Sequence, residues 1–284
     1  MVEQMEDWGL VARCWQAMLD AWPYSERLLF TVGTAVTLEL TTLIYSLFFV
    51  MLERRKWCQS WRIQPNPALS SPPKELVDEA FKDHLLNAIV LRPIFAYFAY
   101  PVIEWCQMPY DTASLPSMGT AVVQVFIFMV IDDTWFYWGH RLLHDVPWLY
   151  RTIHKKHHRF RFTHVLASEF AHPVEDVLCN TLATILGPLL LGSHWILFWF
   201  YGFLKLSQTI EAHSGYVVPG PLSPWCLSPE LAGELGRHEF HHSHNKGNYG
   251  GFFNWWDRLC GTDKKYNEWI AAGKPPFKEL VASE

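Results

Sequence analysis

Residues 138–158 read WGHRLLHDVPWLYRTIHKKHH and place five histidines within nineteen residues, directly after a long apolar run. Their last three, His154, His157 and His158, have a His-x-x-His-His spacing that returns far downstream at His238, His241 and His242. Residues three and four apart share one face of a helix, so the members of each group can meet at one metal ion. Each of these two distant segments could therefore supply a similar set of ligands to a metal site.

The number of histidines predicts more than one metal. His140 and His144 are four residues apart and add a pair to the two triplets. Together these residues supply eight imidazoles: His140, His144, His154, His157, His158, His238, His241 and His242. A single zinc ion takes only about three or four protein ligands. We therefore expect two ions. Spacing does not choose their identity, because neutral imidazole binds iron, zinc, copper and nickel.

The composition indicates a membrane protein. The chain of 284 residues is 16% aromatic, with 15 Trp, and only 18% charged, whereas soluble proteins are about a quarter charged. No linker divides it, so residues 1–284 are predicted to form a single domain. The mild net charge of −5 excludes a general nucleic-acid role. Six cysteines without C-x-x-C spacing argue against a disulfide scaffold.

Three apolar stretches are long enough to cross a bilayer of about 30 Å, at residues 28–52, 85–106 and 118–138. Pro93 and Pro101 are expected to kink the second stretch. Basic residues at 54–56 place the end of the first span on the cytosolic side. Two further crossings bring the chain back to that side. The end of the third span, and the histidines that follow it, are therefore predicted to lie in the cytosol.

The remaining segments complete an all-α, multi-pass membrane bundle. Residues 175–213 are apolar but broken by Gly187-Pro188 and Gly192-Ser193, which predicts a helical hairpin that dips into the membrane. The hairpin would bring His213 back beside His172 and the first cluster. With about four to five embedded helices, the bundle would carry a cytosolic cap, residues 140–173 and 214–284, holding a His-rich dimetal site.

The motifs in combination resemble the fatty acid hydroxylase superfamily of membrane di-iron enzymes. The resemblance runs from about 130 to 266 and rests on the histidine clusters with their surroundings: Asp132-Asp133-Thr134-Trp135, Glu169-Phe-Ala-His172-Pro, Glu211-Ala-His213-Ser-Gly-Tyr216, Gly247-Asn-Tyr249, Trp255-Trp-Asp-Arg258 and Gly261-Thr-Asp263. The pattern is most similar to the methylsterol monooxygenase branch. Cholesterol 25-hydroxylases and sterol C5-desaturases share parts of it.

The resemblance implies an enzyme of the endoplasmic-reticulum membrane that hydroxylates an unactivated C–H bond of a membrane lipid, most simply the C4-methyl group of a sterol. It implies two iron ions, O2, and electrons from NAD(P)H through cytochrome b5 or a similar reductase partner. Zinc, which has no redox chemistry, could replace iron in purified protein. His172 and His213 would raise the ligand count to ten, whereas His84, His164, His194 and His244 lack the pattern.

Five carboxylates near the histidines in sequence are expected to orient the ligands, because ligating imidazoles commonly give their outer N–H to a carboxylate. They are Asp133, Glu169, Glu211, Glu239 and Asp257. Other functions stay open at this stage. A related lipid hydroxylase or sterol desaturase, a hydrolase that uses the metals as Lewis acids, and a membrane protein that binds metal without turnover all fit the same ligands.

Overall fold

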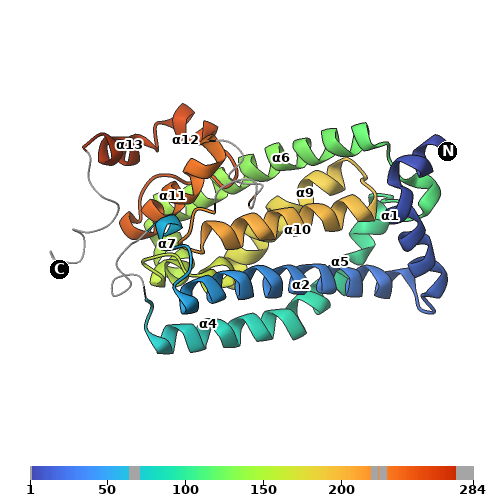
Figure 1. Cartoon of the computed structure of the whole chain (residues 1–284), viewed down its shortest axis with the longest axis horizontal. Helices are drawn as coiled ribbons and strands as arrows, with labels where there is room; N and C mark the ends of the chain where they lie inside the picture. Colours follow the sequence, from blue (N-terminus) through green and yellow to red (C-terminus); the bar gives the residue numbers. More distant parts are fainter. Residues whose placement is uncertain (1, 64–70, 219–222, 224–228, 273–284) are drawn as a thin grey trace.

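The structure, a computed structural model, describes residues 2–63, 71–218, 223 and 229–272. Over these residues the chain forms helices and no sheet, and one isolated bridge pairs Arg62 with Tyr216. The predicted all-α class is confirmed. The helices lie along a common long axis, with α1 (Val2–Ala21) across one end and the elements that carry the histidines at the other end (Figure 1).

Three helices are long and apolar enough to cross a membrane: Glu26–Arg55, Lys74–Trp105 and Met118–Asp145. They contain nearly all of the three predicted spans and are longer than each of them. Ser25 and Ser117 begin the first and third helices by accepting hydrogen bonds from the amides of Leu28 and Thr120. Leu, Ile, Val and Phe side chains remain exposed along these helices, as expected for surfaces that face lipid.

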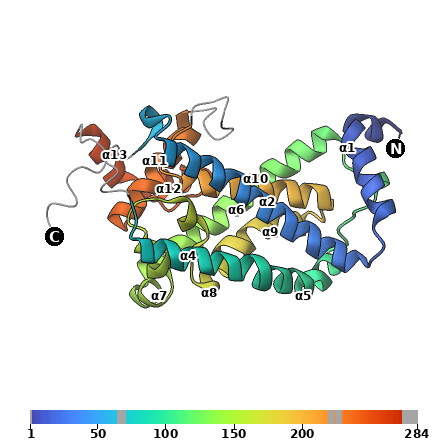
Figure 2. The same cartoon turned by 60° about the horizontal axis from the view of Figure 1, so that its bottom comes forward.

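The second span is one continuous helical segment made of α4 (Lys74–Leu86), the π-helical η2 (Asn87–Leu91) and α5 (Arg92–Trp105) (Figure 2). The sequence predicts a kink at Pro93, and the structure has the wider π turn directly before it. Pro93 has no N–H for the α-helical bond to the preceding turn, and π turns relieve such defects. Residues 74–84, which precede the predicted span, belong to the same helical segment.

The third span does not end where the sequence predicts. α6 (Met118–Asp145) continues through residue 138 without a break, so His140 and His144 lie on the last turns of the membrane-spanning helix itself. α7 (Pro147–Thr152) then begins at a proline, which is favoured in the first turn of a helix. The first histidine pair is therefore fixed by a long, packed helix.

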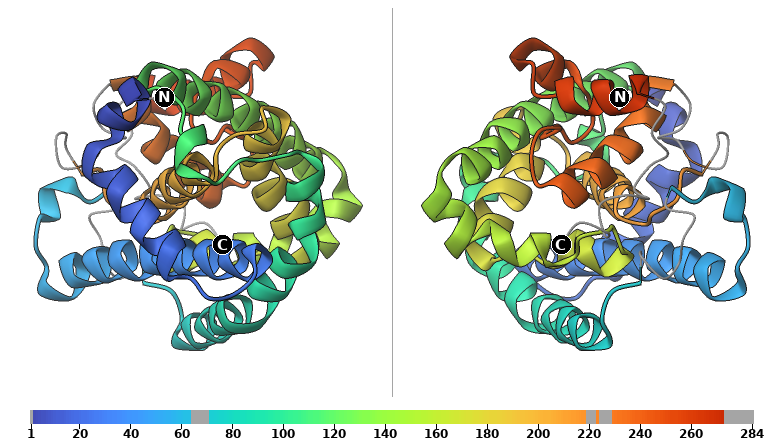
Figure 3. Two further views of the ribbon diagram at one scale, coloured as in Figure 1. Left: turned by 90° about the vertical axis from the view of Figure 1, so that its right-hand side faces the viewer. Right: turned by 90° about the vertical axis from the view of Figure 1, so that its left-hand side faces the viewer.

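The predicted hairpin, residues 175–213, corresponds to four consecutive elements that span 173–212: α8 (Pro173–Glu175), the π-helical η6 (Asp176–Thr181), α9 (Leu182–Leu190) and α10 (Trp195–Ala212). α9 packs on α6, and α10 packs on α2. Gly187 permits the first contact, because a Cβ there would lie 2.9 Å from the Cα of Phe128. Viewed from either end, α10 lies toward the middle of the bundle (Figure 3).

The other elements are short and lie mostly near the histidine end of the bundle. They are η1 (Gln59–Trp61), η3 (Thr112–Ser114), η4 (His154–Arg159), η5 (Val165–Glu169), α11 (Pro229–His244), α12 (Trp255–Cys260) and α13 (Lys264–Ala271). Of these, η4 and α11 carry the two histidine triplets.

Candidate metal centre

Nine histidines converge at the end of the bundle, in two adjacent groups. Within each group the candidate ligand nitrogens all lie within 4.8 Å of one another. The first group contains five residues, His140, His144, His154, His158 and His241, and the second contains four, His157, His213, His238 and His242. α6, η4, the end of α10 and α11 each contribute, so the fold joins segments more than eighty positions apart, as from His158 to His241 with their Nε2 atoms 3.1 Å apart.

The two triplets share a spacing but not a conformation. His238, His241 and His242 lie on the α-helix α11, as the spacing predicts. His154, His157 and His158 lie instead on η4, a 3₁₀ segment, so the helical-face argument holds for only one triplet. In η4 the chain splits its triplet between the groups: His154 and His158 enter the first, whereas His157 enters the second.

The outer nitrogens of most of these imidazoles are held by main-chain oxygens. The Nδ1 atoms of His241, His140 and His242 lie 2.7, 3.0 and 2.9 Å from the carbonyl oxygens of Gly247, Tyr249 and Phe160. A carbonyl can only accept, so Nδ1 carries the proton in each ring. Each Nε2 atom is then unprotonated, and its lone pair points toward the centre.

These inward lone pairs face one another at distances that hydrogen bonding does not explain. Nε2–Nε2 separations are 3.1 Å for His140 and His154 and 3.4 Å for His213 and His157. The Nδ1 atoms of these four rings all face oxygen acceptors, so none of the four Nε2 atoms carries a proton. Two ligands held about 2.0–2.1 Å from one ion at angles between 90° and tetrahedral would be about 2.9–3.4 Å apart. The residues present therefore fit a metal ion in each group.

Burial keeps the imidazoles in their metal-binding form. It lowers the pKa of His157 to about 4 and holds the pKa values of His241 and His242 well below the ordinary range, with neighbouring histidines adding to the effect on the last two. Neutral imidazole is the form that ligates metal. The site therefore needs no deprotonation step at neutral pH.

One ligand differs from its neighbours in having a carboxylate partner. The Nδ1 atom of His154 lies 2.8 Å from Oε1 of Glu175, and both side chains are buried. Glu175 is not among the carboxylates predicted from the sequence. The available signal was a carboxylate at the start of an apolar segment, where an unpaired charge is costly. Such a partner fixes the tautomer and orientation of the ring.

His172 is a correction to the predicted ligand set. The structure does not bring it into either group. Its Nδ1 accepts a hydrogen bond from the amide of Val174, 3.2 Å away, and so caps α8. Pro173 begins that helix, which leaves His172 in the capping position. The histidines that converge therefore number nine rather than ten.

The five predicted carboxylates support the frame around the centre instead of the ligands. Glu239 accepts from the amide and hydroxyl of Thr163, and Ser223 donates to Glu211. Asp257 accepts from the amides of Tyr249 and Gly250, which follow the Gly247 carbonyl that holds His241. Asp133 and Glu169 each hold a larger network, described below. Asp257 therefore acts on a loop that presents a ligand, whereas Glu169 binds the first two spans.

Substitution of Asp133 tests whether these carboxylates stabilise the backbone around the centre. Its Oδ1 accepts from the amides of Gly251, Phe252 and Phe253, and its Oδ2 accepts from the indole of Trp255 at 2.6 Å. Asp133→Ala leaves these buried donors unpaired at about 1–3 kcal/mol each. We expect a loss of at least about 3 kcal/mol in unfolding free energy, measured by thermal denaturation. Asp145→Ala, at an exposed ion pair with Arg141, is the control. Equal effects of the two substitutions would contradict this role.

The four histidines outside the pattern lie outside both groups. His194 caps α10 and lies 3.0 Å from the carbonyl of Asp111, and His164 caps η5. His84 contacts Glu169, and His244 stacks on Phe240. Each therefore has a structural partner of its own.

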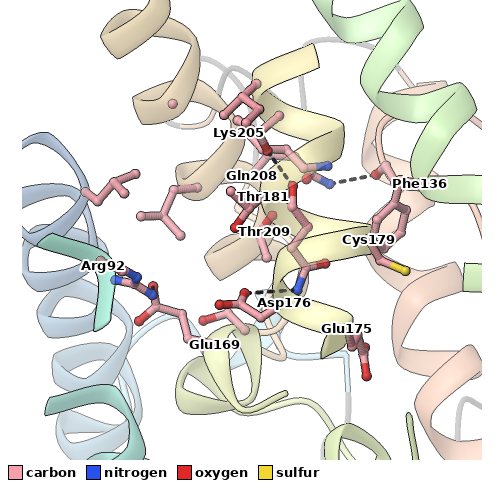
Figure 4. A pocket seen from close by; sticks show the side chains of 18 of the residues that line it. Arg92, Phe136, Glu169, Glu175, Asp176, Cys179, Thr181, Lys205, Gln208 and Thr209 are labelled. Carbon is pink, nitrogen blue, oxygen red and sulfur yellow. Dashed lines mark hydrogen bonds and ion pairs between the residues drawn. The ribbon is translucent and has the colours of Figure 1, made fainter. Parts of the chain in front are cut away.

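An apolar cavity of about 240 Å³ adjoins the centre. His140, His154, His157, His213 and His238 line one end, and residues of α2 and α5 such as Leu38, Phe95 and Ile103 line much of the rest. Figure 4 shows the polar rim, with Arg92 and Glu169 on one side and Lys205, Gln208 and Thr209 of α10 on another. A cavity of this kind suits an apolar ligand with few polar groups.

Helices long enough to cross a membrane, nine convergent imidazoles and an adjoining apolar cavity define a membrane helical bundle with a histidine-rich candidate metal site. The model of the family described as "Fatty acid hydroxylase" matches residues 125–262, which include all nine histidines. The chain belongs to the fatty acid hydroxylase family.

Its curated relatives include proteins with different names. It is 33% identical to methylsterol monooxygenase 1 of Danio rerio over 89% of this chain and 84% of that protein. It is 32% identical to methylsterol monooxygenase 2-1 of Arabidopsis thaliana, over 92% and 97% of the two chains. It is 33% identical to the very-long-chain aldehyde decarbonylase GL1-8 of Oryza sativa subsp. japonica, over 88% and 92%. No solved structure matches the chain.

Proposed function

We propose that this chain is a methylsterol monooxygenase that oxidises the C4-methyl group of a sterol. The observation that carries the proposal is the apolar cavity between the membrane helices, which ends on five of the nine converging imidazoles. The names of the relatives support the sterol as substrate. The reaction is R–CH3 + O2 + 2 e⁻ + 2 H⁺ → R–CH2OH + H2O, and further rounds would take the alcohol to the carboxylate.

The proposed ligands are the five histidines of the first group and the four of the second. When bound there, two iron ions supply the reductive activation of O2, which zinc cannot perform because it has no redox change. Burial holds the imidazoles neutral, and the carbonyl oxygens of Gly247, Tyr249 and Phe160 orient them. The cavity walls exclude water and hold the lipid against the centre.

The proposal includes a location and an electron source. Basic residues at 54–56 follow the first span, which favours the cytosolic side for the histidine end of the bundle. From there, cytochrome b5 or a similar carrier would deliver electrons from NAD(P)H. The family resemblance favours the endoplasmic-reticulum membrane. Residues 140–173 and 214–284 are the proposed cytosolic cap, of which 219–222, 224–228 and 273–284 lie outside the residues that the structure describes.

A second candidate follows from the rice relative, which is similar to this chain to the same degree. Its printed name describes a reaction on a long-chain aldehyde. A flexible apolar chain would also fit the cavity, so the substrate must be tested directly.

The test is expression in cells that lack the C4-methyl oxidation step, followed by sterol analysis by mass spectrometry. We expect accumulated 4-methylsterols to be converted to products that have gained oxygen at the methyl carbon. The matched control is His157→Ala, which should give no product. A gained double bond would indicate a desaturase. Unchanged sterols together with loss of long-chain aldehydes would overturn the sterol assignment.

A further inference from the structure

The polar groups that line the cavity are nearly all engaged with other residues. Lys205 Nζ lies 2.9 Å from Asp132, Arg92 binds Glu39 and Glu169, and Asn180 donates to Asp176. Glu175 is the exception among the charged lining residues that the structure describes. Its Oε1 holds His154, but its Oε2 is buried without a hydrogen-bond partner. A buried carboxylate oxygen in that state costs free energy unless a donor binds it.

Glu175 also lies beside the proposed centre. The His154 ring that it contacts has its Nε2 3.1 Å from that of His140 and 3.0 Å from that of His158. A donor bound to Oε2 would therefore be about one imidazole ring away from the reacting end of the cavity. In Figure 4, Glu175 lies beside the polar rim, at the beginning of the hairpin and near Asp176.

From this geometry we propose that Glu175 is a substrate-positioning residue whose free oxygen binds the hydroxyl group of the sterol. The inference rests on the proposed function. A sterol carries a hydroxyl at C3, next to the C4 carbon that bears the methyl group. A hydrogen bond from that hydroxyl to Glu175 places the C4-methyl at the histidine end of the cavity, while the apolar rings lie between α2 and α5. Glu175 thus links the orientation of a ligand imidazole to recognition of the substrate.

The test compares the binding of a 4-methylsterol with that of the corresponding 3-ketone, which has nearly the same shape but can only accept hydrogen bonds. The full-length protein, loaded with metal and reconstituted in lipid nanodiscs, is titrated with each tritiated sterol without reductant, so no turnover occurs. We expect wild type to bind the alcohol at least about tenfold more tightly, because the ketone leaves the buried Oε2 without a donor. Equal affinities for both sterols in wild type would overturn the inference alone.

Glu175→Gln should remove the preference for the alcohol over the ketone. The amide oxygen can still accept from His154, so metal content should remain at wild-type level, but the amide NH2 now presents a donor to the cavity. Alcohol and ketone both accept from it, so their affinities should differ by less than about twofold. Asp176→Asn, at the neighbouring lining residue, is the matched control and should keep the preference.

The outcomes separate the two proposals. If Glu175→Gln keeps the tenfold preference, or if Asp176→Asn removes it, another residue binds the hydroxyl and the inference is wrong. If Glu175→Gln loses metal, Glu175→Asp replaces it: a shorter carboxylate should retain the preference for the alcohol, and losing it would count against the inference. If wild type binds neither sterol, the sterol assignment itself fails and takes this inference with it.

Discussion

His241→Ala is expected to reduce bound metal below two ions per chain and turnover by more than about a hundredfold. His241 is fully buried, and its Nε2 lies 3.1 Å from that of His158 while Gly247 holds its Nδ1. Loss of a residue that merely supports a ligand already costs about 10–100-fold in affinity or activity. Removing the ligand itself should cost more. Metal content by mass spectrometry and single-turnover assays measure the two effects separately.

The matched control is His194→Ala. His194 is equally buried, but it caps α10 at the far end of the bundle. Its replacement should cost about 1 kcal/mol of stability, the usual effect of removing a cap, with metal content and turnover unchanged. Two bound metals and full turnover in His241→Ala would refute the assignment of His241 as a ligand.

Arg92→Met should produce the largest loss of stability outside the metal centre. Arg92 donates to Glu39 at 2.7 Å and to Glu169, and thus joins both of the first two spans to η5. Its guanidinium and His84 together outweigh the effect of burial and lower the pKa of Glu169 to about 2, so this acid is charged in the folded state. The substitution removes the guanidinium partner of the buried Glu169 carboxylate and leaves it with His84 and Thr42. Loss of one partner of a buried ion pair costs about 3–5 kcal/mol.

We expect the thermal midpoint of Arg92→Met to fall by about 5–8 °C, from that energy and the usual entropy of unfolding for a chain of this size. Arg159→Met is the control, because the Arg159 pair with Glu79 is exposed and worth at most about 1 kcal/mol. Adding Glu39→Gln and Glu169→Gln to Arg92→Met should recover much of the loss. If Arg92→Met and Arg159→Met destabilise equally, the buried network does not hold the spans together.

The sequence was most informative where spacing is local. The triplet at His238, the apolar spans and the histidine pair on α6 could be predicted because helical periodicity and span length depend on neighbouring residues. The π turn before Pro93 and the 3₁₀ conformation of η4 could not be predicted with the same rules. Both conformations depend on backbone hydrogen bonds that the pattern of side chains does not specify.

The contacts around the centre were harder to predict, because they join distant parts of the chain. Glu39 and Arg92 are isolated charges in two apolar spans, which was a signal that they could pair. Glu175 lies 21 positions from His154, and no local rule favours it over Glu169 as the partner of a ligand. His172 shows the reverse error, since its family-like motif predicted a ligand where a helix cap is found.

The central prediction is that two metal ions are bound, one by each group of histidines. The most direct measurement is an anomalous scattering map at the iron absorption edge, from crystals of protein expressed with iron. We expect two peaks, one enclosed by His140, His144, His154, His158 and His241 and the other by His157, His213, His238 and His242. A single peak shared by both groups, or peaks bound elsewhere, would contradict the dinuclear assignment.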